Sequence, residues 1–201
     1  MFVKVCGLDT VESARVAVDA GADAIGVVIS DGSPRNLSVE VATEIVDAVR
    51  ADVQTVLVVS DLPAAQAAET ALRIGVSVLQ LHGGYTSEEF AQARRTFERV
   101  WRATSLGDDT DLHVGARGEE LLLLDAPRAG SGQRWDLSNP ASRRPDGRWL
   151  LAGGLAPDNV AEAVRLATPR GVDVSSGVER TRGVKDHDAI RAFVAAARSV
   201  G

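Results

Sequence analysis

Short apolar runs alternate along the chain with longer amphipathic segments. The short runs are rich in Val, Ile and Leu and are mostly apolar on both faces, which is typical of strands covered on both sides in a parallel sheet. They predict eight strands, at residues 2–6, 24–29, 54–59, 76–81, 99–103, 120–124, 148–152 and 171–174. The segments between them have the apolar spacing of helices and predict six, at residues 11–20, 39–50, 64–74, 87–97, 158–167 and 186–199.

Polar residues and glycines at the segment boundaries support these elements. Good N-cap residues stand before three of the helical segments, glycines follow two of them, and Pro157 suits the first turn of another. The cap candidates are Asp9 or Thr10, Ser38, Thr86 or Ser87, Gly21 and Gly75. Strand followed by helix, repeated along the chain, predicts parallel βαβ units with right-handed crossovers.

The fold class expected from this order is α/β, as a single (β/α)8 TIM barrel over residues 1–201. Such barrels usually have about 250 residues, so we expect a compact barrel with shortened helix 5 and helix 6 regions. Residues 107–118 and 137–147 are the polar stretches where those helices would otherwise stand. A doubly wound open sheet is the alternative, but it usually has a glycine-rich first βα turn. Residues 6–10 hold one glycine and no Walker loop occurs, so the barrel is favoured.

The composition narrows the classes of function. The chain has 22 Lys and Arg against 28 Asp and Glu, a net charge of −6, which argues against nucleic acid or an anionic membrane as a partner. Cys6 is the only cysteine, which excludes an internal disulfide, and no two histidines stand at ligand spacing, so we expect no metal site. No apolar stretch approaches the roughly 20 residues of a membrane span, and the N-terminus lacks a signal-peptide layout. We therefore expect a cytoplasmic protein, monomeric or, as the alternative, homodimeric.

Two loops near the end of the chain carry a phosphate signal. In a barrel the active site lies at the carboxyl ends of the strands, and phosphate commonly binds after strands seven and eight. Gly153-Gly154 follows the seventh predicted strand, and Ser175-Ser176-Gly177 follows the eighth. Backbone N–H groups there, with a short extra helix, would hold a dianion. The alternative is that these glycines only permit tight turns, but two such loops on neighbouring strands favour a phosphate.

Cys6 ends the first predicted strand, where its side chain is expected to point into the barrel mouth. A buried structural thiol is the alternative. Strand alternation puts Lys4 on the same face as Cys6, and an inward lysine needs a partner, for which Asp173 is the candidate. The Lys4 ammonium would favour the thiolate of Cys6. The alternative for Lys4 is a purely structural ion pair.

Asp125 closes a run of four leucines, and an apolar environment would raise its pKa and keep it protonated. It is equally open that Asp125 is an N-cap or a loop anchor. An acid facing a thiolate base suits proton transfer on a sugar phosphate. Arg35 would pair with a substrate carboxylate, or else lie in solvent. His82 is expected to contribute to binding at most, and His113 and His187 receive no role.

These residues lie within segments that resemble the phosphoribosylanthranilate isomerase family. The matching segments run in order from residue 3 to about 194, and the ordered set is specific although each piece is weak. They are KVCGL at 4–8, SPR at 33–35, QLHG at 80–83, LD at 124–125 with GSG at 130–132 and WD at 135–136, LAGGLAPDNV at 151–160, and VDVSSGVE at 172–179 with GVKD at 183–186.

The resemblance implies a cofactor-free isomerase of tryptophan biosynthesis whose partner is a small phosphorylated substrate. It would convert N-(5′-phosphoribosyl)anthranilate into the carboxyphenylamino-deoxyribulose phosphate by an Amadori rearrangement. The resemblance gives Cys6 the role of general base and Asp125 that of general acid. It pairs Arg35 with the anthranilate carboxylate, and it assigns phosphate to the backbone around Gly154 and residues 175–176.

The chain departs from the family pattern in four loops. Residues 126–132 read APRAGSG where the family typically has a Gly-Gly-Thr-Gly stretch, and Trp135 stands where Phe is common. Residues 29–32 lack an aromatic, and residues 179–182 lack a proline. The departures bear on loop closure rather than on the acid or the base.

Two other functions fit parts of this pattern. A related isomerase of histidine biosynthesis runs the same rearrangement, but that family would place an aspartate where this chain has Cys6. A phosphate-binding barrel without activity, acting as a sensor or scaffold, is the alternative outside catalysis. The joint presence of Cys6, Asp125 and Arg35 argues against it.

Overall fold

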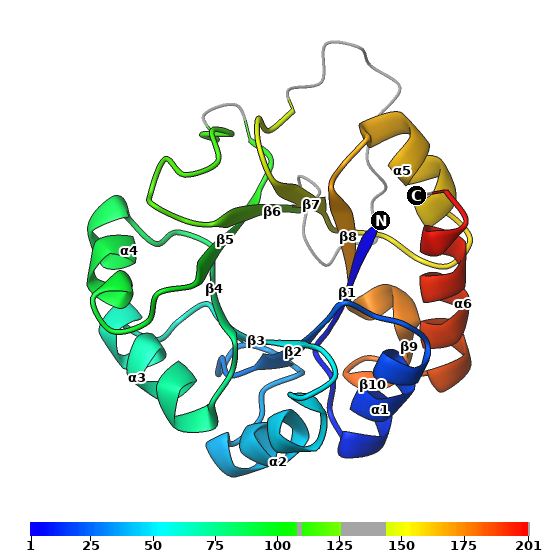
Figure 1. The fold of residues 1–201 in the computed structure, drawn as a ribbon, viewed down its shortest axis with the longest axis horizontal. Helices are drawn as coiled ribbons and strands as arrows, with labels where there is room; N and C mark the ends of the chain where they lie inside the picture. The colour runs from blue at the N-terminus through cyan, green and yellow to red at the C-terminus, as the bar shows by residue number, and fades with distance from the viewer. Residues whose placement is uncertain (108–109, 126–143, 201) are drawn as a thin grey trace.

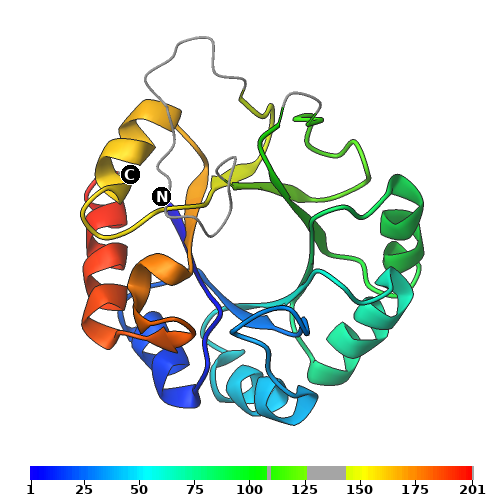
Figure 2. The ribbon, with the colours of Figure 1, turned by 180° about the vertical axis from the view of Figure 1, so that it is seen from behind.

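Eight parallel strands close into a barrel with the helices on its outside. The computed structural model of the chain describes residues 1–107, 110–125 and 144–200. The strands pair in chain order from β1 to β8, and β8 pairs back onto β1 (Figure 1). The view from behind shows the same ring of strands with helices around it (Figure 2). The (β/α)8 barrel expected from the sequence is confirmed.

All the strands and helices that the hydrophobic pattern predicted are present, with ends that shift by a few residues. The strands are β1 (Phe2–Cys6), β2 (Ala24–Val28), β3 (Gln54–Val59), β4 (Val78–His82), β5 (Val100–Ser105), β6 (Leu121–Asp125), β7 (Trp149–Leu151) and β8 (Gly171–Val174). The helices are α1 (Val11–Asp19), α2 (Val39–Val49), α3 (Ala64–Ile74), α4 (Ser87–Arg94), α5 (Val160–Ala167) and α6 (His187–Arg198). The pattern did not predict the 3-10 turn η1 (Ser176–Val178) as a defined element, nor the antiparallel hairpin of β9 (Glu179–Thr181) and β10 (Val184–Lys185).

Local side-chain chemistry explains where several helices begin and end. The Thr10 hydroxyl caps α1, and Thr86 forms a capping box with Glu89 at the start of α4. Gly75 ends α3 with a φ of 78°, a left-handed conformation that glycine adopts without strain. Pro157 is not in the first turn of its helix as expected, because α5 begins at Val160 and Pro157 lies in the turn before it.

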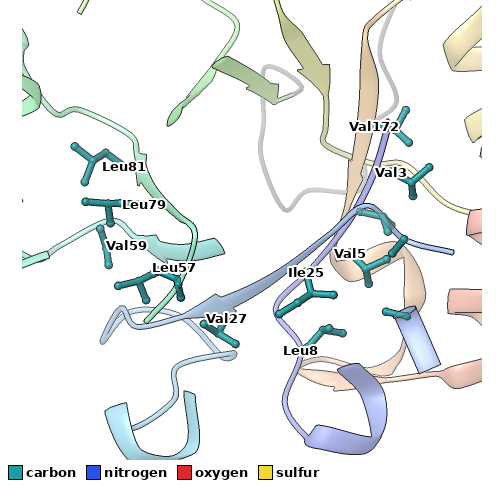
Figure 3. Close-up of a cluster of buried hydrophobic side chains, with 14 of the residues drawn as sticks. Val3, Val5, Leu8, Ile25, Val27, Leu57, Val59, Leu79, Leu81 and Val172 are labelled. Atoms are coloured by element: carbon teal, nitrogen blue, oxygen red, sulfur yellow. The ribbon is translucent and has the colours of Figure 1, made fainter. Parts of the chain in front are cut away.

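The barrel wall separates two apolar layers. Alternate strand residues such as Val3, Val5, Ile25 and Leu57 point outward and pack under the helices (Figure 3). The inner layer is smaller, and at one end of it Phe2 meets Trp101 edge-on with ring centroids 6.2 Å apart. The inner layer also holds the side chain of Cys6, as the alternation along β1 predicts.

The connection after β5 forms no helix in its described part, residues 106–107 and 110–120. Arg102 points outward from β5 in the place that a helix would cover, since its neighbours along the strand belong to the inner layer. Its guanidinium lies 2.6 Å from Glu119 Oε1 and donates to the carbonyls of Asp111 and His113 at 2.8 and 3.0 Å. A buried polar cluster therefore replaces the expected short helix 5. The expected helix 6 region lies mostly outside the described residues.

Among the described residues, no helix is long and apolar enough to span a bilayer.

Candidate active site

One pocket of about 550 Å³ opens at the carboxyl-terminal ends of the strands. The structure brings together in its lining every residue that the sequence predicted for the site. These residues are Cys6, Arg35, His82, Asp125, Gly153, Gly154, Asp173, Ser175 and Ser176. They come from four strands and from the loops after β2, β7 and β8, so the closure of the barrel assembles the site.

Lys4 and Asp173 form a buried ion pair in the barrel interior, directly below the pocket. Lys4 Nζ lies 2.8 Å from Asp173 Oδ1, and the Lys4 side chain is 0% exposed. The partner proposed for Lys4 from the sequence is confirmed. Gly26 stands beside Cys6 on the neighbouring strand, where a Cβ atom would lie 2.9 Å from Cys6 Sγ and 3.4 Å from Lys4 Nζ. The absence of a side chain at residue 26 makes room for both groups.

The Cys6 thiol is harder to ionise than the sequence suggested. Burial raises its pKa, the Lys4 ammonium lowers it, and the Asp173 carboxylate raises it again, so that the net shift is upward. The expected direction of the Lys4 effect is confirmed. Burial outweighs the ammonium, so the ammonium favours the thiolate without making it the prevailing form. The resting side chain at neutral pH is the thiol.

Asp125 ends β6 and is nearly buried at the pocket wall. Burial raises its pKa to about 7, the Asp173 charge adds to the rise, and Lys4 opposes it. The predicted upward shift is confirmed. Asp125 Oδ2 also lies 3.4 Å from His82 Nε2, a contact that the sequence did not indicate. Burial lowers the pKa of His82, which leaves this imidazole neutral at pH 7.

Arg35 is held in place rather than solvated. Its Nε lies 2.5 Å from Glu179 Oε1 and its Nη2 lies 3.0 Å from Glu179 Oε2, a bidentate ion pair between the loop after β2 and β9. The arginine also crosses the backbone of Gly7, where a Cβ atom would lie 2.4 Å from Arg35 Cδ. The guanidinium is thereby fixed at the rim, next to the end of β1.

The loops after β7 and β8 touch each other at the rim. Gly153 and Gly154 adopt φ values of 80° and 68°, which glycine tolerates. A Cβ atom on Gly177 would lie 1.8 Å from the Leu155 carbonyl oxygen, so only glycine allows this approach. The two glycine-containing loops thus meet beside Ser175, and both line the pocket.

Sequence reasoning assigned no role to Glu179 or Lys185, two residues that support the site. Lys185 Nζ is buried, donates to the Ser175 carbonyl at 2.9 Å and lies 3.0 Å from Glu179 Oε1. Burial raises the pKa of Glu179, but Arg35, the Gly183 N–H and Lys185 outweigh it and hold the pKa below its usual range. The signal available in the sequence was an acid and a lysine inside the VDVSSGVE and GVKD segments.

Gln80, another residue that sequence reasoning left without a role, lines the pocket floor. It is 1% exposed, and its Oε1 has no hydrogen-bond partner among the described residues. Within that part of the chain, no cluster of His, Cys, Asp and Glu side chains could hold a metal ion.

The arrangement brings two titratable groups, an arginine and two glycine-containing loops together in one pocket. Cys6 and Asp125 project from β1 and β6 and share Asp173 and Lys4 as charged neighbours. A weakly acidic thiol and a carboxyl group with a pKa near 7 suit proton shuttling on a small anionic molecule. A guanidinium such as that of Arg35 suits a carboxylate, and backbone N–H groups in glycine-containing loops suit a phosphate.

Comparisons with known proteins agree on one family. A family model described as N-(5′-phosphoribosyl)anthranilate (PRA) isomerase matches residues 3–196. The N-(5′-phosphoribosyl)anthranilate isomerase of Haloferax volcanii is 42% identical over 212 residues, covering 98% of this chain and 93% of the relative. The crystal structure of TrpF from Jonesia denitrificans is 55% identical with a TM-score of 0.93, covering 100% of this chain and 98% of that one. A phosphoribosyl anthranilate isomerase in complex with reduced 1-(o-carboxyphenylamino)-1-deoxyribulose 5-phosphate is 32% identical, with a TM-score of 0.85 and 99% of each chain covered.

Proposed function

The chain belongs to the N-(5′-phosphoribosyl)anthranilate isomerase family, and on that basis we propose how its own residues carry the reaction. It is an isomerase of tryptophan biosynthesis that acts on a small phosphorylated substrate. The reaction rearranges an aminoaldose phosphate into an aminoketose phosphate. The observation that carries the residue assignment is that Cys6 and Asp125 line one pocket with Arg35 and the two glycine-containing loops.

Asp125 is the general acid and Cys6 the general base. Asp125 donates its proton to the furanose ring oxygen while the bond from that oxygen to C1′ breaks, and the anthranilate nitrogen lone pair forms the C1′=N bond of a Schiff base. The Cys6 thiolate then removes the C2′ proton. The electrons of that C–H bond form the C1′=C2′ bond of an enolamine, while the π electrons of the C1′=N bond return to the anthranilate nitrogen. Proton transfer from the C2′ hydroxyl to C1′ gives the ketone. Each step moves only protons and electron pairs, so the residues need no cofactor for it.

The pKa values of the two groups set which protonation state reacts. Asp125 has a pKa of about 7 and burial raises the pKa of Cys6, so a singly deprotonated pair carries its proton mainly on sulfur. The reactive form, with the proton on Asp125 and a thiolate on Cys6, is the minor tautomer of that pair. Lys4 stabilises this tautomer because its ammonium lowers the Cys6 pKa. A bell-shaped dependence of kcat/KM on pH follows, rising through about pH 7 as the first proton leaves.

The substrate spans the pocket between two anion-binding ends. Arg35 pairs with the anthranilate carboxylate, and the backbone around Gly153, Gly154 and residues 175–176 binds the phosphate. His82, neutral and 3.4 Å from Asp125, contacts the substrate beside the acid. Asp173 orients Lys4 and borders the sugar from below.

The remaining expectations concern assembly and location. The exposed large apolar side chains of the described residues are Val41, Leu72 and Leu166, on three different helices. Because scattered apolar residues do not form an interface patch, this supports a monomer, which we also place in the cytoplasm. Light scattering on a sizing column tests the assembly, and a mass of twice 21.1 kDa contradicts the monomer.

The experiment that tests the residue roles follows the loss of phosphoribosylanthranilate fluorescence. We expect turnover by the wild-type protein and a fall in kcat of about 10²- to 10⁴-fold in Cys6→Ser and in Asp125→Asn. Circular dichroism should show that both variants remain folded. A variant that keeps wild-type turnover removes that residue from the mechanism.

A further inference from the structure

A single buried carboxylate, that of Glu179, connects the two ends of the pocket. It accepts bonds from Arg35 through both oxygens, from Lys185 through Oε1 at 3.0 Å, and from the Gly183 backbone N–H through Oε2 at 3.0 Å. Its side chain is 4% exposed. The carboxylate thus stands between one cation at the pocket rim and another cation beneath the phosphate loop.

The bond to Arg35 fixes the guanidinium and leaves part of it available. A guanidinium has five N–H donors, and Glu179 accepts from Nε and Nη2. Donors on Nη1 and Nη2 remain on the far edge for a substrate carboxylate. An arginine side chain that is already ordered loses less rotational freedom when a ligand binds. Glu179 therefore prepares Arg35 for binding without competing for the same edge.

The bond to Lys185 reaches the other end of the pocket. Lys185 also donates to the carbonyl of Ser175, the residue that opens the loop after β8. The hairpin that carries Glu179 and Lys185 is itself set against the Arg35 loop, because a Cβ atom on Gly183 would lie 2.7 Å from the Pro34 carbonyl oxygen. Glu179 therefore belongs to one hydrogen-bond network with both Arg35 and the loop at Ser175.

We propose that Glu179 is a positioning residue that aligns the carboxylate-binding Arg35 with the phosphate-binding loop at Ser175. This inference rests on the proposed role of Arg35. Without the charge of Glu179, Arg35 and the buried Lys185 lose their shared partner. Arg35 can then swing away from Gly7, and Lys185 no longer anchors the loop. Substrate binding then weakens at both ends, while Asp125 keeps its surroundings and Cys6 keeps Lys4 and Asp173 beside it. The effect belongs to KM rather than to kcat.

The test compares Glu179→Gln with Glu120→Gln in the fluorescence assay. Glu120 forms an equivalent bidentate pair with Arg99, at 3.0 and 3.0 Å, but on the protein surface at the opposite end of β6 from Asp125. We expect Glu179→Gln to raise KM at least tenfold with kcat within about threefold, since losing one charged hydrogen-bond partner costs about one decade or more in affinity. We expect Glu120→Gln to leave both parameters unchanged.

A double-variant cycle and a phosphate titration separate positioning from a structural effect. In an Arg35→Ala background, Glu179→Gln should raise KM by a clearly smaller factor than it does in the wild type, since the guanidinium that Glu179 aligns is gone. The inhibition constant of inorganic phosphate should rise in Glu179→Gln and stay unchanged in Arg35→Ala. If Glu179→Gln does not fold, the same measurements apply to Glu179→Asp, which is too short to hold both cations and should also raise KM.

The outcomes distinguish the inference from the function on which it rests. Three results would overturn the positioning role. They are a wild-type KM in both Glu179 variants, KM effects of Arg35→Ala and Glu179→Gln that simply multiply in the double variant, and an unchanged inhibition constant of phosphate in Glu179→Gln. A wild-type protein that does not turn over the substrate overturns the proposed roles in the reaction instead.

Discussion

Two buried ion pairs lie on opposite sides of the barrel wall and have different surroundings. Inside, Lys4 and Asp173 are 2.8 Å apart below the pocket. Outside, Arg102 and Glu119 are 2.6 Å apart in the helix-free connection after β5. The inner pair has titratable neighbours, because the pKa shifts of Cys6, His82 and Asp125 all include its charges. The outer pair directs its remaining donors to backbone carbonyls.

The comparison shows that neighbours decide what a buried ion pair does. The inner pair adjusts the ionisation of Cys6 and Asp125, whose pKa values are raised chiefly by burial, since its charges act across a site sheltered from water. The outer pair holds a loop in the place of a helix, and the carbonyls it binds do not titrate. Similar chemistry therefore shifts the pKa values of neighbouring side chains in one place and holds a loop in the other.

The largest effects on stability and on kcat together should come from Lys4→Met in the inner pair. Removal of the ammonium leaves Asp173 buried without its partner, which should lower the free energy of unfolding by about 3–5 kcal/mol. The Cys6 pKa should rise further, so kcat should fall roughly a hundredfold and the alkaline limb of the pH profile should move up. Denaturant titration and initial rates measure the two effects. Loss of stability with unchanged kcat would separate Lys4 from the base.

Arg102→Met should match the stability loss and spare the chemistry. Glu119 then stands unpaired and two carbonyls lose their donor, so a loss of about 3–5 kcal/mol is expected, with kcat/KM unchanged at a temperature where the variant is folded. Thermal unfolding and the fluorescence assay provide the readouts, and Glu119→Gln is the milder companion variant. A large fall in kcat would mean that the outer pair also acts on the pocket.

Asp125→Asn should show, through the pH dependence of stability, how far burial and the Asp173 charge raise the Asp125 pKa. Folding raises the Asp125 pKa from 3.8 to about 7, so between these values the native state holds a proton that the unfolded state has lost. Wild-type stability therefore falls as pH rises from about 4 to 7, by up to about 4 kcal/mol from this group. The asparagine variant lacks this term, so its stability relative to the wild type should increase over that range. Denaturant curves at pH 4.5, 6 and 7.5 check the sign, and a constant difference contradicts the raised pKa.

The smallest effect is expected for an exposed pair. Arg99 and Glu120 form a bidentate contact with both side chains more than a third exposed, and such pairs contribute about 0–1 kcal/mol. Arg99→Met should shift the unfolding midpoint by no more than that and lose its effect in high salt. A loss of unfolding free energy as large as that of Arg102→Met would show that burial does not explain the difference between the Arg99–Glu120 and Arg102–Glu119 pairs.

The pattern of apolar residues made the barrel predictable from the sequence. The strands β1 to β8 are short buried apolar runs, and the helices α1 to α6 each bury one apolar face. The pairing of Lys4 with Asp173 also followed, because strand alternation dictates which side chains point inward. The hairpin of β9 and β10 did not follow, because strands of three and two residues carry too little pattern to detect. Its position had to come from the structure.

Charge balance at the site was predictable only in part. The approach of Lys4 to Cys6 could be inferred, but the degree of burial depends on barrel closure and on Gly26, so the net rise of the thiol pKa could not. The bond between Arg35 and Glu179 joins residues 144 positions apart, a separation at which no local pattern signals contact. The site roles of Cys6, Asp125 and Arg35 remain predictions for the assays above.

The position of Cys6 in the pocket wall also allows its alkylation to report whether the pocket is occupied. The chain has one cysteine, and it lies in the pocket wall with 7% of its surface open. A thiol-alkylating reagent can react only at the pocket, and only with the ionised sulfur. Labelling should be slow near neutrality, quicken in alkaline buffer, and stop when a ligand fills the pocket, so that the fraction of labelled protein reports occupancy without any added probe group.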